Sequence, residues 1–473
     1  MELTQAGRRT ARKTLATLGI AAIVVTGCAA PGAVATPSPT AAPSSAAPSV
    51  APSAPASAEA SVASVAPSAS AAAGPTCGTD PVTLSIYYET ISELMPQLSA
   101  EFTKQYPNVT FDLKSDSFAN GTSALPRLLS SDSPPDISRA AMLVDLNKDG
   151  LLLNMDKWAT AYGWDQWPQA QFDAVRIAPD FKRGTGSIFA WPILPSTVGV
   201  FYNKDLAAKI GMTAPPKTVD EFDALLAKAK AAGLQPIMQW NASTSGGGLA
   251  FPLQNLMAAY GDHNKINDWV FDKAGANIDT PEFNQAATKL DEWVKKGYFP
   301  SDVNAIEYTD AAGRFGKGEG VFTFNGDWQN AGYDKDLPGK VGFFTFPEGV
   351  GMSAGVTYVV AAKSKHPDCA MFFLNWAWTN DKAREIDVKV GGGNPGGPPD
   401  GSLPTVSSDS VISQTLAAGA GVTKNSGAMD FIANATSTIF FNSWTPDLQK
   451  LVGGKITPEK VIQNAQAFWA KSQ

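Results

Sequence analysis

The alternation of apolar and polar positions divides the chain near residues 28 and 77. After residue 77, short β-branched and aromatic runs alternate with segments whose apolar residues recur every three or four positions. Val82–Tyr88 and Val109–Leu113 are typical of strands, and Leu94–Tyr106 between them is typical of an amphipathic helix. A strand, a helix and a strand in this order predict a parallel pair of strands.

The same alternation continues through the C-terminal half. Threonines precede two of the later helical segments and predict N-caps there, at Thr218 and Thr280. The further predicted strands are Val198–Tyr202, Leu234–Trp240, Val321–Phe324 and Val356–Ala362, and the further helices are Val219–Ala232, Thr280–Lys296 and Asp368–Trp378. We therefore expect an α/β fold with open sheets covered by helices.

The first 28 residues have the composition of an export signal. A basic start that includes Arg8 and Arg9 precedes the apolar run Leu15–Val25, which is shorter than the roughly 20 residues that a membrane-spanning helix needs. The run ends in Val-Thr-Gly-Cys, which resembles a bacterial lipobox whose cysteine carries the lipid. We interpret residues 1–27 as a lipoprotein signal peptide and Cys28 as the lipidated residue, with palmitate among its acyl chains.

Two alternatives for this region stay open. The first is an ordinary secretory cleavage site with an incidental cysteine. The second is twin-arginine export at Arg8-Arg9, although the aliphatic pair that usually follows is missing.

Residues 28–76 form a segment of biased composition. After Cys28 the segment consists almost entirely of Ala, Pro, Ser, Val and Thr, and Glu59 is its only charge. Such a segment cannot bury enough apolar surface to offset its chain entropy, so we expect a disordered linker. We interpret it as a spacer that holds the folded part, residues 77–473, at the outer face of the cell membrane.

Composition excludes several classes of protein. The 473 residues exceed what one hydrophobic core usually organises, and a net charge of −7 argues against a nucleic-acid partner. With three Cys and only two His, His263 and His366, we expect neither a metal site nor a cofactor.

Several segments together resemble the maltose-binding-like family of extracellular solute-binding proteins, which serve ABC importers. They are Phe102–Val109, Pro134–Ile137, Val144–Leu146, Gly150–Leu152, Trp191–Pro192, Phe201–Leu206, Pro215–Phe222, Phe315–Gly318 and Asn325–Trp328. The chain departs from the family where Tyr87 or Tyr88 replaces the usual first-strand Trp, and at Val219, where many members have Trp.

The resemblance implies a periplasmic-binding-protein-like fold with two lobes joined by three crossovers. Lobe 1 would contain residues 77–193 and 355–392, and lobe 2 would contain residues 197–352 and 398–473. The crossovers would lie near residues 191–199, 352–357 and 391–400, where glycines in the last stretch suit a hinge. A ligand would be held between the lobes and delivered to a membrane permease by a monomeric protein.

In open α/β sheets, ligands bind beyond the carboxyl ends of strands. Residues at these positions, and at the crossovers, form our candidate ligand site: Tyr87, Tyr88, Glu89, Ser138, Arg139, Ser196, Thr197, Trp240, Asn241, Asn325, Asp327, Trp328, Gly393 and Asn394. Indole and phenol rings stack on sugar faces, and carboxylates or guanidinium groups pair with sugar hydroxyls. We expect Trp240, Trp328 and Tyr88 to stack, Glu89 and Asp327 to accept, and Arg139 to donate.

Cys77 and Cys369 would be the two thiols that remain after lipidation. An extracytoplasmic location permits a disulfide, and the resemblance places both cysteines in lobe 1. A Cys77–Cys369 bond is therefore one expectation, and two free cysteines are the other.

We expect a binding protein for a sugar or oligosaccharide rather than an enzyme. A binding protein for a non-sugar polyol or phosphodiester is one alternative, in which Arg139 would matter more, and a secreted carbohydrate hydrolase is another. Gly351–Gly355 matches the Gly-x-Ser-x-Gly elbow of serine hydrolases, but a strand is predicted after it where the elbow needs a helix.

Overall fold

The computed structural model describes residues 74–90, 92–194, 196–353 and 356–471. All of them belong to one structural unit, Ser68–Gln473. The signal peptide, Cys28 and the linker up to residue 73, as interpreted from the sequence, lie outside the described residues.

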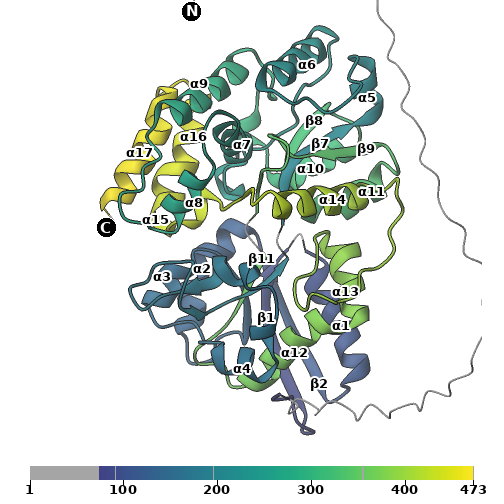
Figure 1. Cartoon of the computed structure of the whole chain (residues 1–473), viewed down its shortest axis with the longest axis vertical. Coiled ribbons are helices and arrows are strands. Elements are labelled where there is room, and N and C mark those ends of the chain that lie inside the picture. Colours follow the sequence, from purple (N-terminus) through teal and green to yellow (C-terminus); the bar gives the residue numbers. More distant parts are fainter. Residues whose placement is uncertain (1–73, 91, 195, 354–355, 472–473) are drawn as a thin grey trace, which may run out of the picture. The chain divides into compact units, whose positions relative to one another are not determined.

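The first sheet has five strands in the order β2 (Val109–Asp116), β1 (Val82–Glu89), β3 (Ile137–Ala140), β11 (Val356–Val360) and β6 (Trp191–Leu194) (Figure 1). β1 runs parallel to both β2 and β3, whereas β11 is antiparallel to β3 and β6. The helix α1 (Leu94–Gln105) connects β1 to β2, so the predicted β-α-β unit is confirmed.

A cluster of aromatic side chains forms part of the core beside this sheet. Trp378 of α12 (Pro367–Thr379) packs on the rings of Trp164, Trp167, Phe172 and Trp191, with centroids 5.2–5.8 Å apart. All of these rings are buried, and burying a large aromatic side chain contributes several kcal/mol to stability.

The second sheet has the order β12 (Ala428–Met429), β10 (Gly351–Met352), β7 (Val198–Asn203) and β8 (Phe322–Gly326), and β9 (Val341–Phe344) also pairs with β7. Its core includes residues of α6 (Val219–Ala231), α7 (Ala250–Tyr260), α9 (Pro281–Lys295) and α17 (Pro458–Lys471). The predicted caps are present, because the Thr218 and Thr280 hydroxyls accept from the N–H groups of Glu221 and Phe283.

Shorter elements complete the described fold. The helices are α2 (Phe118–Ser130), α3 (Leu143–Lys148), α4 (Asp156–Ala161), α5 (Lys204–Lys209), α8 (Asn264–Val270), α10 (Tyr308–Gly316), α11 (Asn330–Asp336), α13 (Asp381–Ile386), α14 (Val411–Lys424), α15 (Ser437–Ile439) and α16 (Thr445–Val452). The 3-10 or π segments are η1 (Trp164–Gln166), η2 (Gln169–Val175), η3 (Ser243–Ser245), η4 (Val303–Ala305), η5 (Asp327–Gln329), η6 (Asp387–Gly391), η7 (Ile432–Asn434) and η8 (Phe440–Trp444), and β4 (Arg176–Ile177) pairs with β5 (Ser187–Ile188).

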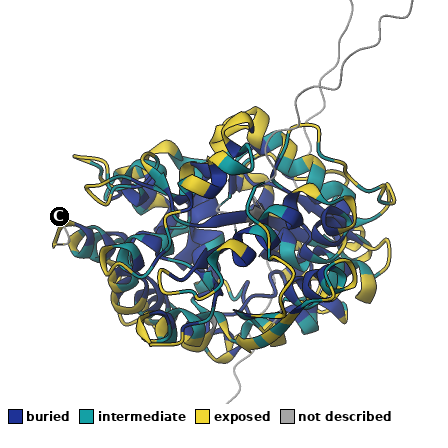
Figure 2. Ribbon diagram, turned by 90° about the horizontal axis from the view of Figure 1, so that it is seen from below, coloured by how far each residue is buried: buried dark blue, intermediate teal, exposed yellow. Residues whose placement is uncertain are grey.

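The chain passes between the two sheets three times, after β6, after β10 and after η6. Each sheet has its own buried apolar cluster, so the expected α/β fold with two cores and three crossovers is confirmed. The lobe boundaries given above stay predictions. Figure 2 shows buried residues along the strands and exposed residues on the outer sides of the helices.

The predicted strand Leu234–Trp240 is wrong. Only an isolated parallel bridge joins Ile237 to Phe322. Beyond it, the Gln239 side chain makes both bonds to the Phe324 backbone, accepting from its N–H at 3.1 Å and donating to its carbonyl at 3.0 Å. The side chain thus occupies the backbone groups that a continuing strand would use.

Arg384 of α13 holds the segment that follows the third crossover. Its guanidinium donates to the carbonyls of Trp378 at 2.8 Å, Gly396 at 2.7 Å and Ser402 at 2.7 Å, and the residue is 3% exposed. Arg384→Ala should lower the free energy of unfolding by about 2–3 kcal/mol, because the buried carbonyl of Trp378 and the partly buried bonds to Gly396 and Ser402 lose a charged donor.

Chemical denaturation measures this loss, and Lys382→Ala on the same helix serves as the control. Lys382 forms an exposed pair with Glu385, so its removal should cost no more than about 1 kcal/mol. Equal stability of the two variants would contradict the role assigned to Arg384.

Candidate functional site

The carboxyl ends of β1 and β3 bring an acid and a base together. Glu89 is the last residue of β1, and Arg139 lies in β3 opposite Tyr358 of β11. Arg139 Nε lies 3.8 Å from Glu89 Oε2, and the two side chains are only 17% and 21% exposed. Arg139 Nη1 also donates to the carbonyls of Ala140 and Thr357, which fixes the guanidinium beside the carboxylate.

Burial governs the charge state of this pair. Removal from water raises the pKa of Glu89, and the nearby guanidinium of Arg139 opposes that rise. The Glu89 carboxylate has lost hydrogen bonds to water through burial, and a hydroxyl group of a ligand could replace them.

The end of β8 supplies an aromatic group from the second sheet. The indole N–H of Trp328 donates to the Tyr308 hydroxyl at 2.9 Å, and that hydroxyl donates to Gln329 Oε1 at 2.9 Å. The Trp328 ring lies directly on Gly326, where a Cβ atom would come within 2.1 Å of it. Glycine at this position therefore allows the half-buried ring to lie flat against its own strand.

The two halves of the fold meet beside the Glu89–Arg139 pair. Burial raises the pKa of Tyr308 of α10 well above its usual range. Phe118 of α2 packs edge-on against Phe440 at 6.0 Å, and the Arg139 guanidinium lies 5.6 Å from the Phe118 ring centroid. The site is therefore built from both sheets.

A small pocket continues from Glu89 and Arg139 toward α2. Its lining also includes Tyr87, Tyr88, Asp116, Ser117, Phe118, Gly121 and Thr122. The Tyr87 hydroxyl donates to Asp116 Oδ2 at 3.2 Å, and burial together with this carboxylate raises the pKa of Tyr87 to about 12.

Sequence reasoning missed several of these residues. Asp116 is the last residue of β2, as Glu89 is of β1, and Ser117 follows Asp116. Both were missed because the predicted strand ended at Leu113. Tyr308 lies at the start of a helix and Tyr358 within a strand, so neither follows a predicted strand.

Several candidate residues carry buried polar atoms that have no hydrogen-bond partner among the described residues. These atoms are Ser138 Oγ, Arg139 Nε, Ser196 Oγ, Asn241 Oδ1 and Asp327 Oδ1. A buried polar atom without a partner costs free energy, and such atoms at a binding site are satisfied by ligand or water. Five of the seventeen such atoms among the described residues belong to the candidate set, and a polyhydroxylated ligand could supply partners for them.

Trp240 does not offer an open stacking face in this structure. It is 3% exposed, and it packs edge-on against Phe251 at 5.3 Å and Tyr308 at 4.8 Å. Gly248 covers part of its ring, since a Cβ there would come within 2.4 Å. Trp240 therefore packs behind Tyr308 in this structure, and its expected stacking role stays a prediction.

Asp327 connects the crossovers. Its Oδ2 accepts from the Thr197 N–H at 2.9 Å, and a Cβ on Gly392 of the third crossover would come within 2.2 Å of its carbonyl oxygen. Of the neighbouring candidates, Gly393 is buried and Asn394 is exposed. Oδ2 of Asp327 is therefore used by the first crossover, and Oδ1, which carries the proton while the carboxyl is neutral, can donate to a ligand oxygen.

Another cavity lies elsewhere on the first sheet. Thr83, Asp112, Lys114, Asp136 and His366 are among its lining residues. Asp136 is bonded to Ser85 and Ser364, and Lys114 pairs with Asp112 at 2.9 Å. These charges already have partners, so we do not assign a ligand site there.

Comparison with known proteins identifies the class. Residues 88–384 match the profile of the bacterial extracellular solute-binding protein family, and the chain belongs to this family. Two uncharacterized ABC transporter extracellular-binding proteins of Pyrococcus horikoshii are each 24% identical over 61% of this chain. The matches span 66% and 65% of those relatives, just under two thirds of their length.

Solved structures show the same fold. A chitin oligosaccharide binding protein superposes with a TM-score of 0.68 at 20% identity, covering 83% of this chain and 99% of its own. A maltose-bound protein of T. maritima superposes with a TM-score of 0.66 at 17% identity, and the match covers 83% of this chain and 100% of that protein. A binding protein in complex with raffinose superposes with a TM-score of 0.61 at 18% identity, and the match covers 82% of this chain and 99% of that protein.

The described residues contain neither a membrane-spanning helix nor a group of metal-ligating side chains. Within residues 74–471, apart from the short gaps at 91, 195 and 354–355, no helix combines the length and apolarity needed to cross a bilayer. The part of the chain that the structure describes contains no group of three or more His, Cys, Asp or Glu side chains placed to hold a metal ion.

The buried carboxyl of Asp327 predicts a pH effect on stability. Burial raises its pKa from 3.8 to about 8, although the Thr197 N–H opposes the rise. Between pH 4 and 8 the folded protein keeps a proton that the unfolded chain releases, so this group lowers stability as pH rises through that range.

Asp327→Asn should remove this loss. The stability of the variant relative to the native protein should therefore increase from pH 4 to pH 8 and level off above it. Thermal unfolding across this range measures the effect, with exposed Asp409→Asn as the control. A difference that does not change with pH would show that Asp327 is ionised in the folded protein.

Proposed function

We propose that this protein is the extracytoplasmic substrate-binding component of an ABC importer, which captures a sugar or oligosaccharide and delivers it to a membrane permease. The observation that supports this most directly is the Glu89–Arg139 pair of the first sheet, which lies beside the place where Phe118 of α2 packs against Phe440 of η8. A ligand held there would contact both halves of the fold.

The chemistry of these groups suits a neutral polyhydroxylated ligand. A partly open indole and Tyr88 can cover the flat faces of a sugar ring, while carboxylate, guanidinium and unpartnered polar atoms can pair with its hydroxyls. Because Glu89 already lies beside Arg139, the pair supplies both a donor and an acceptor without a net charge. This balance favours a sugar over a phosphodiester.

The similar structures support the same ligand class. They are described as binding chitin oligosaccharide, maltose and raffinose, which are all carbohydrates. At these identities the likeness concerns the fold, so the ligand class rests on the residues of this chain together with that likeness.

The lobes that would close on the ligand are those expected from the sequence, residues 77–193 with 355–392 and residues 197–352 with 398–473. The two buried clusters support this division. Ligand drives closure only through the contacts that it gains in the closed form. Trp328 and Glu89 would supply such contacts from opposite lobes.

The remaining parts of the proposal concern location. A lipid on Cys28 and the linker to residue 76 would tether a monomeric binding module to the outer face of the cell membrane, within reach of its permease. The family supports an extracellular place of action, and the lipobox-like sequence supports the anchor.

A thermal-shift screen over mono- and oligosaccharides tests the function. A ligand that binds only the folded state raises the melting temperature, and calorimetry then gives its affinity and stoichiometry. Binding of a polyol or phosphodiester with no response to any sugar would overturn the ligand class. Release of a cleaved sugar would instead support the alternative of a secreted hydrolase.

Trp328 provides the first prediction for the ligand found by the screen. Trp328→Ala should weaken binding by about 1–3 kcal/mol, because the stacking surface is removed. Without ligand the variant should stay folded with a lowered melting temperature, since the half-buried ring also packs on Gly326 and donates to Tyr308. Trp328→Phe keeps a ring and should lose less. Calorimetry measures both variants, and unchanged affinity in Trp328→Ala would remove this residue from the site.

Glu89 provides the second prediction for that ligand. Glu89→Gln should weaken binding by about 1.5–3 kcal/mol, because a neutral amide accepts sugar hydroxyls less strongly and leaves Arg139 without its counter-charge. Glu385→Gln is the matched control, since Glu385 is paired with Lys382 and Lys389 on a distant helix. Equal affinities in the two variants would place Glu89 outside the contact surface.

A further inference from the structure

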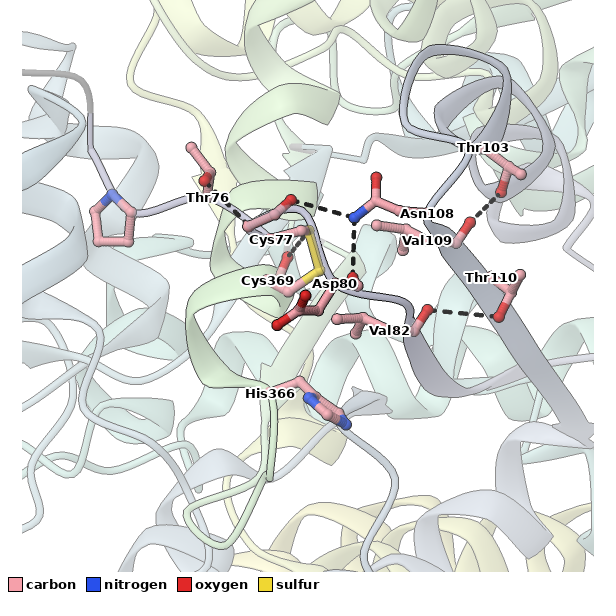
Figure 3. Close-up of a disulfide and its surroundings, with 12 residues drawn as sticks. Thr76, Cys77, Asp80, Val82, Thr103, Asn108, Val109, Thr110, His366 and Cys369 are labelled. Atoms are coloured by element: carbon pink, nitrogen blue, oxygen red, sulfur yellow. Dashed lines mark hydrogen bonds between the residues drawn. A yellow bond between two sulfur atoms is a disulfide. The ribbon is translucent and has the colours of Figure 1, made fainter.

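The segment that enters the fold at its N-terminal side is fixed at three points, of which Figure 3 shows the disulfide and the contacts of Asn108. The Tyr162 hydroxyl donates to the Pro75 carbonyl at 2.5 Å. Cys77 is bonded to Cys369 with an S–S distance of 2.00 Å. Asn108 Nδ2 donates to the carbonyls of Gly78 and Asp80 at 3.2 and 3.1 Å. We call this arrangement the entry clamp.

The entry clamp lies directly before β1, the strand that carries the site. Only residues 78–81 separate Cys77 from Val82, where β1 begins, and the strand ends at Glu89. Without the clamp, any pull on the preceding chain would act along β1 toward Tyr88 and Glu89.

The disulfide gives such a pull another route. Cys369 lies in the first turn of α12, is 4% exposed and is followed by the buried Ala370 and Met371. The neighbouring Asp368 accepts from the indole N–H of Trp158 at 2.8 Å. A force that reaches Cys77 therefore passes through a covalent bond into a helix that is packed along much of its length.

The connectivity also encloses the site. The bonded cysteines are 292 positions apart, and the enclosed chain contains β1, β3, β8 and β11. Chain inside a disulfide loop is bypassed when the protein is pulled at its two ends, because the covalent bond carries the load.

We propose that the entry clamp protects β1 from tension on the N-terminal linker. It transfers tension on the linker to α12 and leaves β1, with its site residues, without load. That the linker is under tension depends on the proposed membrane anchor. That the tension reaches α12 depends on the disulfide and the hydrogen bonds of the entry clamp. The clamp thus allows a tethered module to be pulled without disturbing Glu89.

Optical-tweezers pulling tests the proposal on the chain from residue 29 to residue 473, with handles at its two ends. The oxidised protein is compared with a Cys77→Ser/Cys369→Ser variant. In the variant, we expect the first rupture at a lower force, with release of the chain that contains β1. In the oxidised protein, β1 should stay folded until the surrounding core fails.

Hydrogen exchange without load provides a second measurement. In the double variant, amides of β1 should exchange faster than in the oxidised protein, whereas amides of β7 in the second sheet should be unchanged. If the variant does not fold, the oxidised protein treated with reductant after folding takes its place.

Two results would overturn the proposal. One is an equal first-rupture force with and without the disulfide. The other is an equal acceleration of exchange in β1 and β7, which would make the bond a general stabiliser. Neither measurement uses a ligand, so failure here is distinct from failure of the sugar screen.

Discussion

The parallel pairing of β1 with β2 and β3 is the constraint on which the site depends. Parallel strands direct their carboxyl ends to one edge of the sheet, and this edge brings Glu89, Asp116 and Arg139 close together from segments that lie far apart in the chain. An antiparallel arrangement would place alternate strand ends at opposite edges. The acid–base pair and its pocket therefore follow from strand direction before any ligand is considered.

The proposed closure has to be balanced against contacts that need no ligand. Arg183 and Asp430 form a buried pair at 2.6 Å between residues packed with different sheets, and the Ser437 N–H donates to Asp145 Oδ2 at 2.8 Å. Arg183 also donates to the Ala174 carbonyl, and Asp430 accepts from Asn434, so each charge has a partner on its own side. If the pair separated, each charge would keep one neutral partner and would gain contact with water, which would offset part of the ion pair that is lost.

Local patterns predicted the elements that local physics determines. Strand β1, helix α6 with its Thr218 cap and the apolar helix α12 follow from periodicity and capping, and the three crossovers follow from motif order. The predicted strand at Leu234–Trp240 was wrong because the Gln239 side chain competes for the same backbone groups. That competition is a long-range contact, which spacing along the chain does not report.

The candidate site shows the same division between local and long-range information. Glu89 and Arg139 were predicted because each lies at a strand end, whereas the packing of Trp240 depends on Gly248 and on Tyr308, which is 68 residues away in the sequence. The site strand therefore has two kinds of support. Its amino end is fixed by a covalent bond and two side-chain contacts. Beside its carboxyl end, Ser138 Oγ and Arg139 Nε of β3 have no hydrogen-bond partner among the described residues, and the proposed ligand would supply one. The disulfide thus anchors the strand at the point where the interpreted linker ends and the fold begins.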